Sequence, residues 1–358
     1  MKVLIVDDSA LMRRSLSEML SHLRGTEVIV ARDGVDALDS IERHNPDVVT
    51  LDINMPNMDG LTCLSHIMTR FPRPVVMVSS LTDSSAIATF EALEMGAVDY
   101  IAKPGGTVSL NIREVRNQLI VKVRAAYRQR HLFSGRARAY GTVHRAEQPS
   151  RQLDTLVRGL VVIGVSTGGP STLEQILPLL SADFPLPIVV CQHMPSSFTR
   201  VFAERLNGRC ALEVREVSQV MELNAGTVYV AKGDADCTLG IRANKPFLVP
   251  CPPSENFNWH PSVSRMTASL LKHLPASRIV AVMLTGMGND GAEEMKTIYD
   301  RGGVTLAESE KDCAVFGMPK ALIELGGAKQ VLDVARMPSA ITSAATSVAK
   351  QGVIESWA

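Results

Sequence analysis

The sequence predicts an α/β protein of two domains, each built around a mainly parallel β-sheet. Three features lead to this expectation. Short apolar runs recur along the chain, segments with helical spacing separate them, and a basic, polar stretch divides the pattern into two sets. Alternation of strands and helices is typical of parallel sheets covered by helices on both faces. A length of 358 residues with 46% hydrophobic residues suits about two such domains.

The first domain is expected over residues 1–124. Its helical segments carry apolar residues at helical spacing, as at Met12, Leu16, Met19 and Leu23, and others follow at Val35–His44, Leu61–Arg70 and Ala86–Gly96. The runs between them are apolar almost throughout, as in strands buried on both faces. The five expected strands are Val3–Val6, Val28–Ala31, Val48–Leu51, Val75–Val78 and Tyr100–Ala102.

Residues 125–156 are basic, small and polar with little periodicity, which is typical of a linker. A nucleic-acid-binding arm is the alternative interpretation of this stretch. The second domain is expected over residues 157–348. Its expected strands are Leu160–Val165, Ile188–Gln192, Val228–Ala231, Ile279–Leu284 and Val304–Ala307, with helices over about 171–181, 196–206, 262–274, 290–301 and 319–325.

Composition narrows the classes of function. The 37 Lys and Arg residues balance 37 Asp and Glu, so no overall field favours a nucleic-acid partner or an anionic membrane. The N-terminus shows no signal peptide, and no apolar run nears the roughly 18 residues that span a bilayer. We therefore expect a cytoplasmic protein with no membrane insertion, monomeric by default. Its scattered cysteines show no metal-ligand spacing and are expected as buried thiols: Cys63, Cys191, Cys210, Cys237, Cys251 and Cys313.

Polar residues follow successive strands of the first domain. Asp7 and Asp8 end the first strand, Asp52 the third, Ser79 the fourth and Lys103 the fifth. Strand ends of a parallel sheet meet at one edge, where open α/β folds place their ligands. Crowded carboxylates require a hard cation such as Mg²⁺, and a lysine there suits a phosphoryl oxygen. Any single aspartate at a strand end is more often solvated or a helix cap, but the whole set predicts a phosphoryl-accepting site.

These residues resemble the receiver domain of two-component response regulators, through LIVDDSALMRR, LDINMPNMDG, MVSS and DYIAKP in about residues 1–105. The resemblance implies a flavodoxin-like (βα)5 fold, with Asp52 phosphorylated by a histidine kinase. It also implies Mg²⁺ held by Asp7, Asp8, Asp52 and the carbonyl of Asn54. The residues that respond to the phosphoryl group would be Ser79, Lys103 and Tyr100.

Ser166, His193 and Asp290 each follow an expected strand of the second domain. Ser166 lies in GVSTGGP, whose glycines permit a sharp strand-to-helix turn that exposes the hydroxyl. A phosphate-binding loop is the alternative for this motif, a structural histidine for His193, and a helix N-cap for Asp290. His260 competes as the base. A hydroxyl, an imidazole and a carboxylate at one sheet edge match the logic of a serine hydrolase.

The segments GVSTGGP, CQHMPSSFT, LTGMGNDG and AESEKDCAVFGMPKAL resemble the catalytic domain of the chemotaxis protein-glutamate methylesterases, the CheB family, over about 157–345. The resemblance implies a doubly wound sheet with Ser166 as nucleophile, His193 as base and Asp290 as its orienting acid. Backbone N–H groups of Met287 and His193 would bind the oxyanion, and no cofactor would be needed. The substrates would be glutamyl methyl esters, and glutamines for deamidation, on methyl-accepting chemotaxis receptors.

Two sites on one chain suggest regulation. We expect the unphosphorylated receiver to cover the edge that carries Ser166, and phosphorylation at Asp52 to favour an open form. Two alternatives remain for the second domain. A DNA-binding output domain predicts a compact basic helical fold, and a non-catalytic interaction module predicts no hydrolysis.

Overall fold

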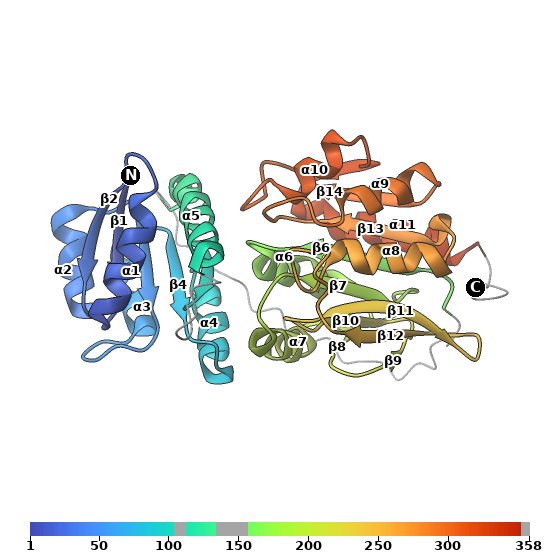
Figure 1. The fold of residues 1–358 in the computed structure, drawn as a ribbon, viewed down its shortest axis with the longest axis horizontal. Coiled ribbons are helices and arrows are strands. Elements are labelled where there is room, and N and C mark those ends of the chain that lie inside the picture. Colours follow the sequence, from blue (N-terminus) through green and yellow to red (C-terminus); the bar gives the residue numbers. More distant parts are fainter. Residues whose placement is uncertain (104–111, 134–156, 352–358) are drawn as a thin grey trace. The chain divides into compact units, whose positions relative to one another are not determined.

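The computed structural model describes residues 1–103, 112–133 and 157–351, and the chain divides into two compact units, Met1–Gly141 and Thr142–Ala358 (Figure 1). Among the described residues, no helix is both long enough and apolar enough to cross a membrane.

The first unit is a five-stranded parallel sheet in the order β2-β1-β3-β4-β5. Its strands are β1 (Lys2–Val6), β2 (Glu27–Ala31), β3 (Val48–Asp52), β4 (Val75–Ser79) and β5 (Asp99–Ala102). Its helices are α1 (Ala10–Ser21), α2 (Gly34–His44), α3 (Gly60–Arg70), α4 (Asp83–Glu94) and α5 (Ile112–Arg128). The expected five-stranded α/β fold is confirmed.

Helices α1 and α5 cover one face of this sheet, where Leu16 and Val123 join Ile5 in one buried cluster. Helix α5 runs to Arg128, and a 3-10 turn covers Gln129–Leu132, so helical structure enters the stretch expected as linker. The cause is packing, because Ala126 extends the buried stripe of the helix by one further position. Residues 134–156 of the expected linker lie outside the described residues.

The second unit contains a seven-stranded parallel sheet, in the order β15-β14-β13-β6-β7-β10-β8, and a three-stranded antiparallel sheet, β11-β12-β9. The strands of the large sheet are β6 (Leu160–Val165), β7 (Ile188–Gln192), β8 (Glu213–Val217), β10 (Thr227–Ala231), β13 (Ile279–Met283), β14 (Val304–Glu308) and β15 (Gln330–Leu332). The small sheet consists of β9 (Met221–Glu222), β11 (Asp236–Arg242) and β12 (Lys245–Cys251).

The helices of this unit lie on both faces of the large sheet, as the expected doubly wound architecture requires. They are α6 (Gly169–Ile176), α7 (Ser196–Arg209), α8 (Val263–His273), α9 (Ala292–Asp300), α10 (Met318–Glu324) and α11 (Met337–Ala349), with 3-10 turns at Leu177–Leu179, Ala276–Arg278 and Val334–Arg336. The chain moves from β6 toward β7 through α6, but from β13 toward β14 through α9. Right-handed crossovers in opposite directions place α6 and α9 on opposite faces. The order therefore reverses at β6, which is where open α/β sheets bind ligands.

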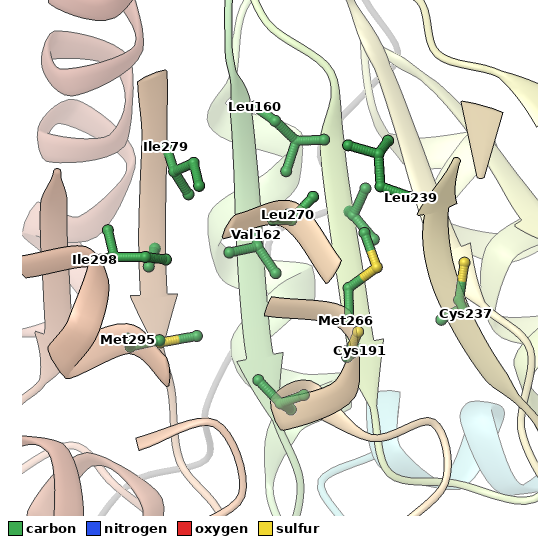
Figure 2. Packing of buried hydrophobic residues seen from close by; sticks show 14 of the residues in the cluster. Leu160, Val162, Cys191, Cys237, Leu239, Met266, Leu270, Ile279, Met295 and Ile298 are labelled. Carbon is green, nitrogen blue, oxygen red and sulfur yellow. The ribbon is translucent and has the colours of Figure 1, made fainter. Parts of the chain in front are cut away.

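One hydrophobic cluster fills the face under α8, α9 and the small sheet. Figure 2 shows Met266 and Leu270 of α8 over Val162 of β6, with Met295 and Ile298 of α9 beside Ile279 of β13. Cys191 and Cys237 belong to the same cluster as free thiols. The core therefore holds the ends of β6, β7 and β13 in fixed register.

The β11–β12 hairpin is absent from the sequence expectations. Its turn uses Ala243 and Asn244, both at positive φ (48° and 60°), rather than the Asn-Gly or Asp-Gly pair that marks such turns. Pro246 and Pro250 lie within β12, and proline in a run argues against a strand. The sequence expectations also lack strand β9, the edge strands β8 and β15, and helix α11.

Candidate functional site

Ser166, His193 and Asp290 follow three neighbouring strands, because β6 pairs with β7 on one side and β13 on the other (Figure 1). The ladder continues past the strand ends. The Ser166 amide donates to the Thr285 carbonyl at 2.9 Å, and the His193 amide donates to the Val165 carbonyl at 3.1 Å. The structure thus brings the loops of all three predicted residues to the carboxyl edge at the switch in strand order.

His193 and Asp290 form a direct pair. Nε2 of His193 lies 2.9 Å from Oδ2 of Asp290, and their side chains are only 8% and 2% exposed. The other ring nitrogen, Nδ1, is buried and has no hydrogen-bond partner within the described residues. A carboxylate can only accept, so it fixes the hydrogen on Nε2 and leaves the lone pair on Nδ1.

Asp290 is also the acceptor for the first turn of α8. Its oxygens accept hydrogen bonds from the amides of Val263 at 2.7 Å and Ser264 at 2.9 Å, and from the Ser262 hydroxyl at 3.1 Å. Burial opposes ionisation of this carboxyl, but the hydrogen bonds from His193 and the two amides outweigh it and lower the pKa of Asp290. The carboxylate is therefore charged, and its hydrogen bonds fix its position next to the imidazole.

Ser166 occupies a tight turn between β6 and α6. Gly168 has φ +79°, and a Cβ on Gly169 would overlap the side-chain oxygen of Gln192. The buried Gln192 amide donates to the carbonyls of Ser166 at 2.8 Å and His193 at 3.1 Å. Gln192 therefore ties the serine turn to the histidine loop, a role that its position inside an apolar strand run did not reveal.

Met287, the residue expected to donate to the oxyanion, lies in the loop after β13. The hydrogen bonds of the described residues include none donated by the Met287 amide. Next to it, Gly288 has φ +89° and packs against the indole of Trp259. The second expected donor fits less well, because the His193 amide already donates to the Val165 carbonyl.

His260, the competing base, binds elsewhere. Its Nδ1 lies 2.9 Å from Oδ1 of Asp236, a carboxylate with no exposed side-chain surface. The neighbouring residue, Trp259, stacks on His193 with 5.9 Å between ring centroids and 4° between ring planes. His260 thus anchors the loop that carries Trp259.

A buried glutamate, Glu308, is connected to Ser166 through Thr285. Oε2 of Glu308, at the end of β14, accepts from the Thr285 amide at 2.7 Å, while Oε1 is buried with no hydrogen-bond partner in the described chain. Thr285 in turn accepts from the Ser166 amide and donates through its hydroxyl to the Thr167 carbonyl at 2.9 Å. Burial raises the pKa of Glu308 to about 7.

The first unit gathers its predicted acidic residues at the switch between β1 and β3. Carboxylate oxygens of Asp7, Asp8 and Asp52 lie within 4.8 Å of one another, an arrangement typical of a divalent cation site. Nζ of Lys103 lies 2.7 Å from Asp52 and 3.0 Å from Asp7. Burial raises the pKa of Asp52 more than the Lys103 hydrogen bond lowers it, whereas the two carboxylates outweigh burial and raise the pKa of Lys103.

The remaining predicted receiver residues, Ser79, Tyr100 and Asn54, take no part in these ion pairs. The buried Ser79 hydroxyl accepts from Thr89 at 2.9 Å and lies 3.3 Å from the Ser85 carbonyl, so it faces α4. Tyr100 is buried and makes a T-shaped contact with Phe90, with 6.5 Å between centroids, and burial raises its pKa. Asn54 is exposed beside the cluster in sequence, two residues after Asp52.

Comparison with known families agrees with both sites. A family model described as CheB methylesterase matches residues 161–341, and one described as response regulator receiver domain matches residues 3–113. The chain belongs to the CheB family. The second unit matches the methylesterase model, so the alternative of a DNA-binding output domain is wrong, and the seven-stranded sheet agrees.

Other CheB proteins are similar over nearly the whole chain. A protein-glutamate methylesterase/protein-glutamine glutaminase of Rhodospirillum rubrum is 52% identical over 94% of this chain and 94% of its own. One from Vibrio cholerae is 47% identical over 90% of this chain and 91% of its own. The CheB methylesterase catalytic domain of Thermotoga maritima, a crystal structure, is 39% identical with a TM-score of 0.50, covering 52% of this chain and 97% of that one. This CheB chain therefore shares both sequence and catalytic-domain fold with the family.

Proposed function

We propose that this CheB chain is a phosphorylation-regulated serine esterase that hydrolyses glutamyl methyl esters on methyl-accepting chemotaxis receptors and deamidates glutamines there. Its relatives carry the name protein-glutamate methylesterase/protein-glutamine glutaminase. The observation that carries the proposal is the buried pair of His193 and Asp290, in the loops after the two strands that flank β6, with Ser166 directly after β6.

In the proposed reaction, Ser166 Oγ attacks the ester carbonyl carbon while Nδ1 of His193 takes the hydroxyl proton. The imidazolium returns that proton to the departing methoxide, and methanol leaves an acyl-serine. A water molecule then gives a proton to His193 as its oxygen attacks the acyl carbon. Oγ regains the proton and the glutamate product ionises. With a glutamine substrate the leaving group is ammonia.

The assignment of the base to Nδ1 follows from the hydrogen bond on the opposite nitrogen. Asp290 holds Nε2–H, stabilises the imidazolium and does not itself take the proton. The buried, unpartnered Nδ1 is the ring atom left to face the serine hydroxyl. For the oxyanion we retain only the Met287 amide, since the His193 amide already donates within the sheet.

In the receiver we propose Asp52 as the phosphoryl acceptor, with the histidine kinase of the chemotaxis array as donor. The crowded oxygens of Asp7, Asp8 and Asp52 fit Mg²⁺, which the Asn54 carbonyl would also bind. Bound there, Mg²⁺ would neutralise charge on the phosphoryl oxygens. Lys103 would hold one such oxygen, and Ser79 and Tyr100 would move in response. Receptors and kinase of this kind place the chain in the cytoplasm.

The test is methanol release from methyl-esterified chemoreceptor membranes, with and without acetyl phosphate. We expect release by the wild type, a rise with acetyl phosphate, and a loss of about a thousandfold or more in Ser166→Ala. Asp52→Asn should keep the basal rate and lose the rise. Wild-type levels of release by Ser166→Ala would overturn the proposed site, and an Asp52→Asn variant that still responds would overturn the proposed phosphoryl acceptor.

A further inference from the structure

The His193 ring has an aromatic neighbour outside the proposed catalytic set. Trp259 lies parallel to the imidazole, with 4° between ring planes and 5.9 Å between centroids. The hydrogen bond to Asp290 holds only one ring atom, so the imidazole could still turn about its Cβ–Cγ bond when that hydrogen bond lengthens. A flat aromatic surface against the ring opposes such rotation, because turning the imidazole would break the contact.

The same indole reaches the loop that carries the proposed oxyanion donor. A Cβ on Gly288 would lie 2.7 Å from Cζ2 of Trp259, so the indole fits only against a glycine there. Gly288 directly follows Met287 in the chain. Trp259 therefore contacts the imidazole and the loop of the oxyanion donor at once.

The residues that directly follow Trp259 in the chain are bound by two carboxylates, Asp236 and Asp290. The next residue, His260, binds Asp236, which also accepts from the Ser262 amide at 2.9 Å and from Arg265 at 2.6 Å. Burial opposes ionisation of Asp236, but hydrogen bonds from His260 and Arg265 outweigh it and lower its pKa. The following amides, from Val263 and Ser264, bind Asp290. Two buried carboxylates thus fix the segment that directly follows the indole.

We propose that Trp259 is a positioning residue whose indole keeps the His193 ring turned so that Nε2 remains on Asp290 and Nδ1 faces Ser166. This inference rests on the proposed serine-esterase function. The contact acts on the orientation of the base in the reaction step and not on receptor binding. Loss of the aromatic face should therefore lower kcat and leave KM unchanged.

The experiment compares Trp259→Leu, Trp259→Phe and the control Phe257→Leu, which removes an aromatic ring from the same loop. We expect Trp259→Leu to lose about tenfold or more in kcat with KM within about twofold, since small misplacement of a reacting group is costly. Trp259→Phe, which restores a flat ring, should recover most of the rate, and Phe257→Leu should behave like the wild type. Thermal unfolding midpoints of all three variants identify any loss caused by misfolding.

A second readout follows the imidazole itself. In ¹³C-histidine-labelled protein, the His193 ring signals, assigned by their loss in His193→Gln, should change in Trp259→Leu as the imidazole loses its fixed orientation and tautomer. An unchanged signal, or a kcat within about twofold of wild type in a folded Trp259→Leu protein, would overturn the positioning role. Wild type and Ser166→Ala in the same assay decide the esterase function separately, so the two failures are distinguishable.

Discussion

Nε2 of His193 lies 2.9 Å from Oδ2 of Asp290, whereas Nδ1 of the same ring is buried with no partner in the described residues. In the serine-protease template the two nitrogens have the opposite roles, with Nδ1 toward the aspartate. A buried polar atom without a partner costs free energy, and functional sites are where such a cost is retained.

Asp290→Asn should show how much catalysis depends on the orientation of the His193 imidazole, because the variant keeps the imidazole and changes only the group that orients it. An amide removes the negative charge that stabilises the imidazolium and permits the wrong tautomer. We expect kcat for methanol release to fall by about a thousandfold or more, by analogy with the protease aspartate. The NH2 group of asparagine would also face the N–H donors at the start of α8, so the thermal unfolding midpoint should fall. A loss below tenfold in kcat would contradict the assigned role of Asp290.

Gln192→Leu should weaken the link between the serine turn and the histidine loop. The side chain donates to the carbonyls of Ser166 and His193, and leucine leaves both without that donor. We expect the free energy of unfolding to fall by about 1–3 kcal/mol, with a lower kcat because both reacting groups are displaced. Urea unfolding and methanol release measure the two effects. Unchanged stability and kcat would show that Gln192 does not couple the loops.

Glu308 should make the stability of the second unit depend on pH. Burial raises its pKa from 4.5 to about 7 on folding, so between these values the folded protein holds a proton that the unfolded chain has lost. The contribution of Glu308 to the free energy of unfolding is fully present below about pH 4.5 and is lost as pH rises through about 7. The free energy of unfolding changes by about 3 kcal/mol over this range.

Glu308→Gln keeps the shape of the protonated acid and cannot ionise. We expect it to unfold with a flatter dependence on pH between 5 and 8 and to be more stable than the wild type at pH 8. Urea unfolding at several pH values is the measurement. Glu310→Gln, a nearby exposed carboxylate, serves as the control. Parallel pH curves for Glu308→Gln and wild type would rule out this titration.

Mg²⁺ should stabilise the receiver unit. The oxygens of Asp7, Asp8 and Asp52 are crowded in the folded chain and dispersed in the unfolded one, so binding favours the fold. At ten times its dissociation constant a ligand contributes about 1.4 kcal/mol. We expect calorimetry to show that Mg²⁺ raises the unfolding midpoint of the receiver unit in the wild type and in the control Asp39→Asn, but not in Asp8→Asn. An equal rise in all three proteins would mean non-specific binding.

The chemistry at the strand ends could be predicted because it is local. An apolar run followed by Asp7-Asp8, by Ser166 or by His193 places that side chain at a sheet edge, whatever the neighbours are. The residues that support the site could not be predicted this way. Gln192 and Glu308 resemble ordinary strand residues, and Trp259 resembles a loop aromatic, until their contacts are known.

The sequence by itself determined two α/β units, the positions of most strands in the large sheets and the residue types at their ends. Only the tertiary structure decided that β13 lies beside β6, which brings Asp290 to His193 across 97 residues. It also decided the hairpin of β11 and β12, the Trp259 stack, and that His193 rather than His260 pairs with Asp290. The reason is that burial of one face of a helix or strand leaves a periodic pattern of apolar residues in the local sequence. The order of strands depends instead on contacts between distant segments, which no short window of sequence contains.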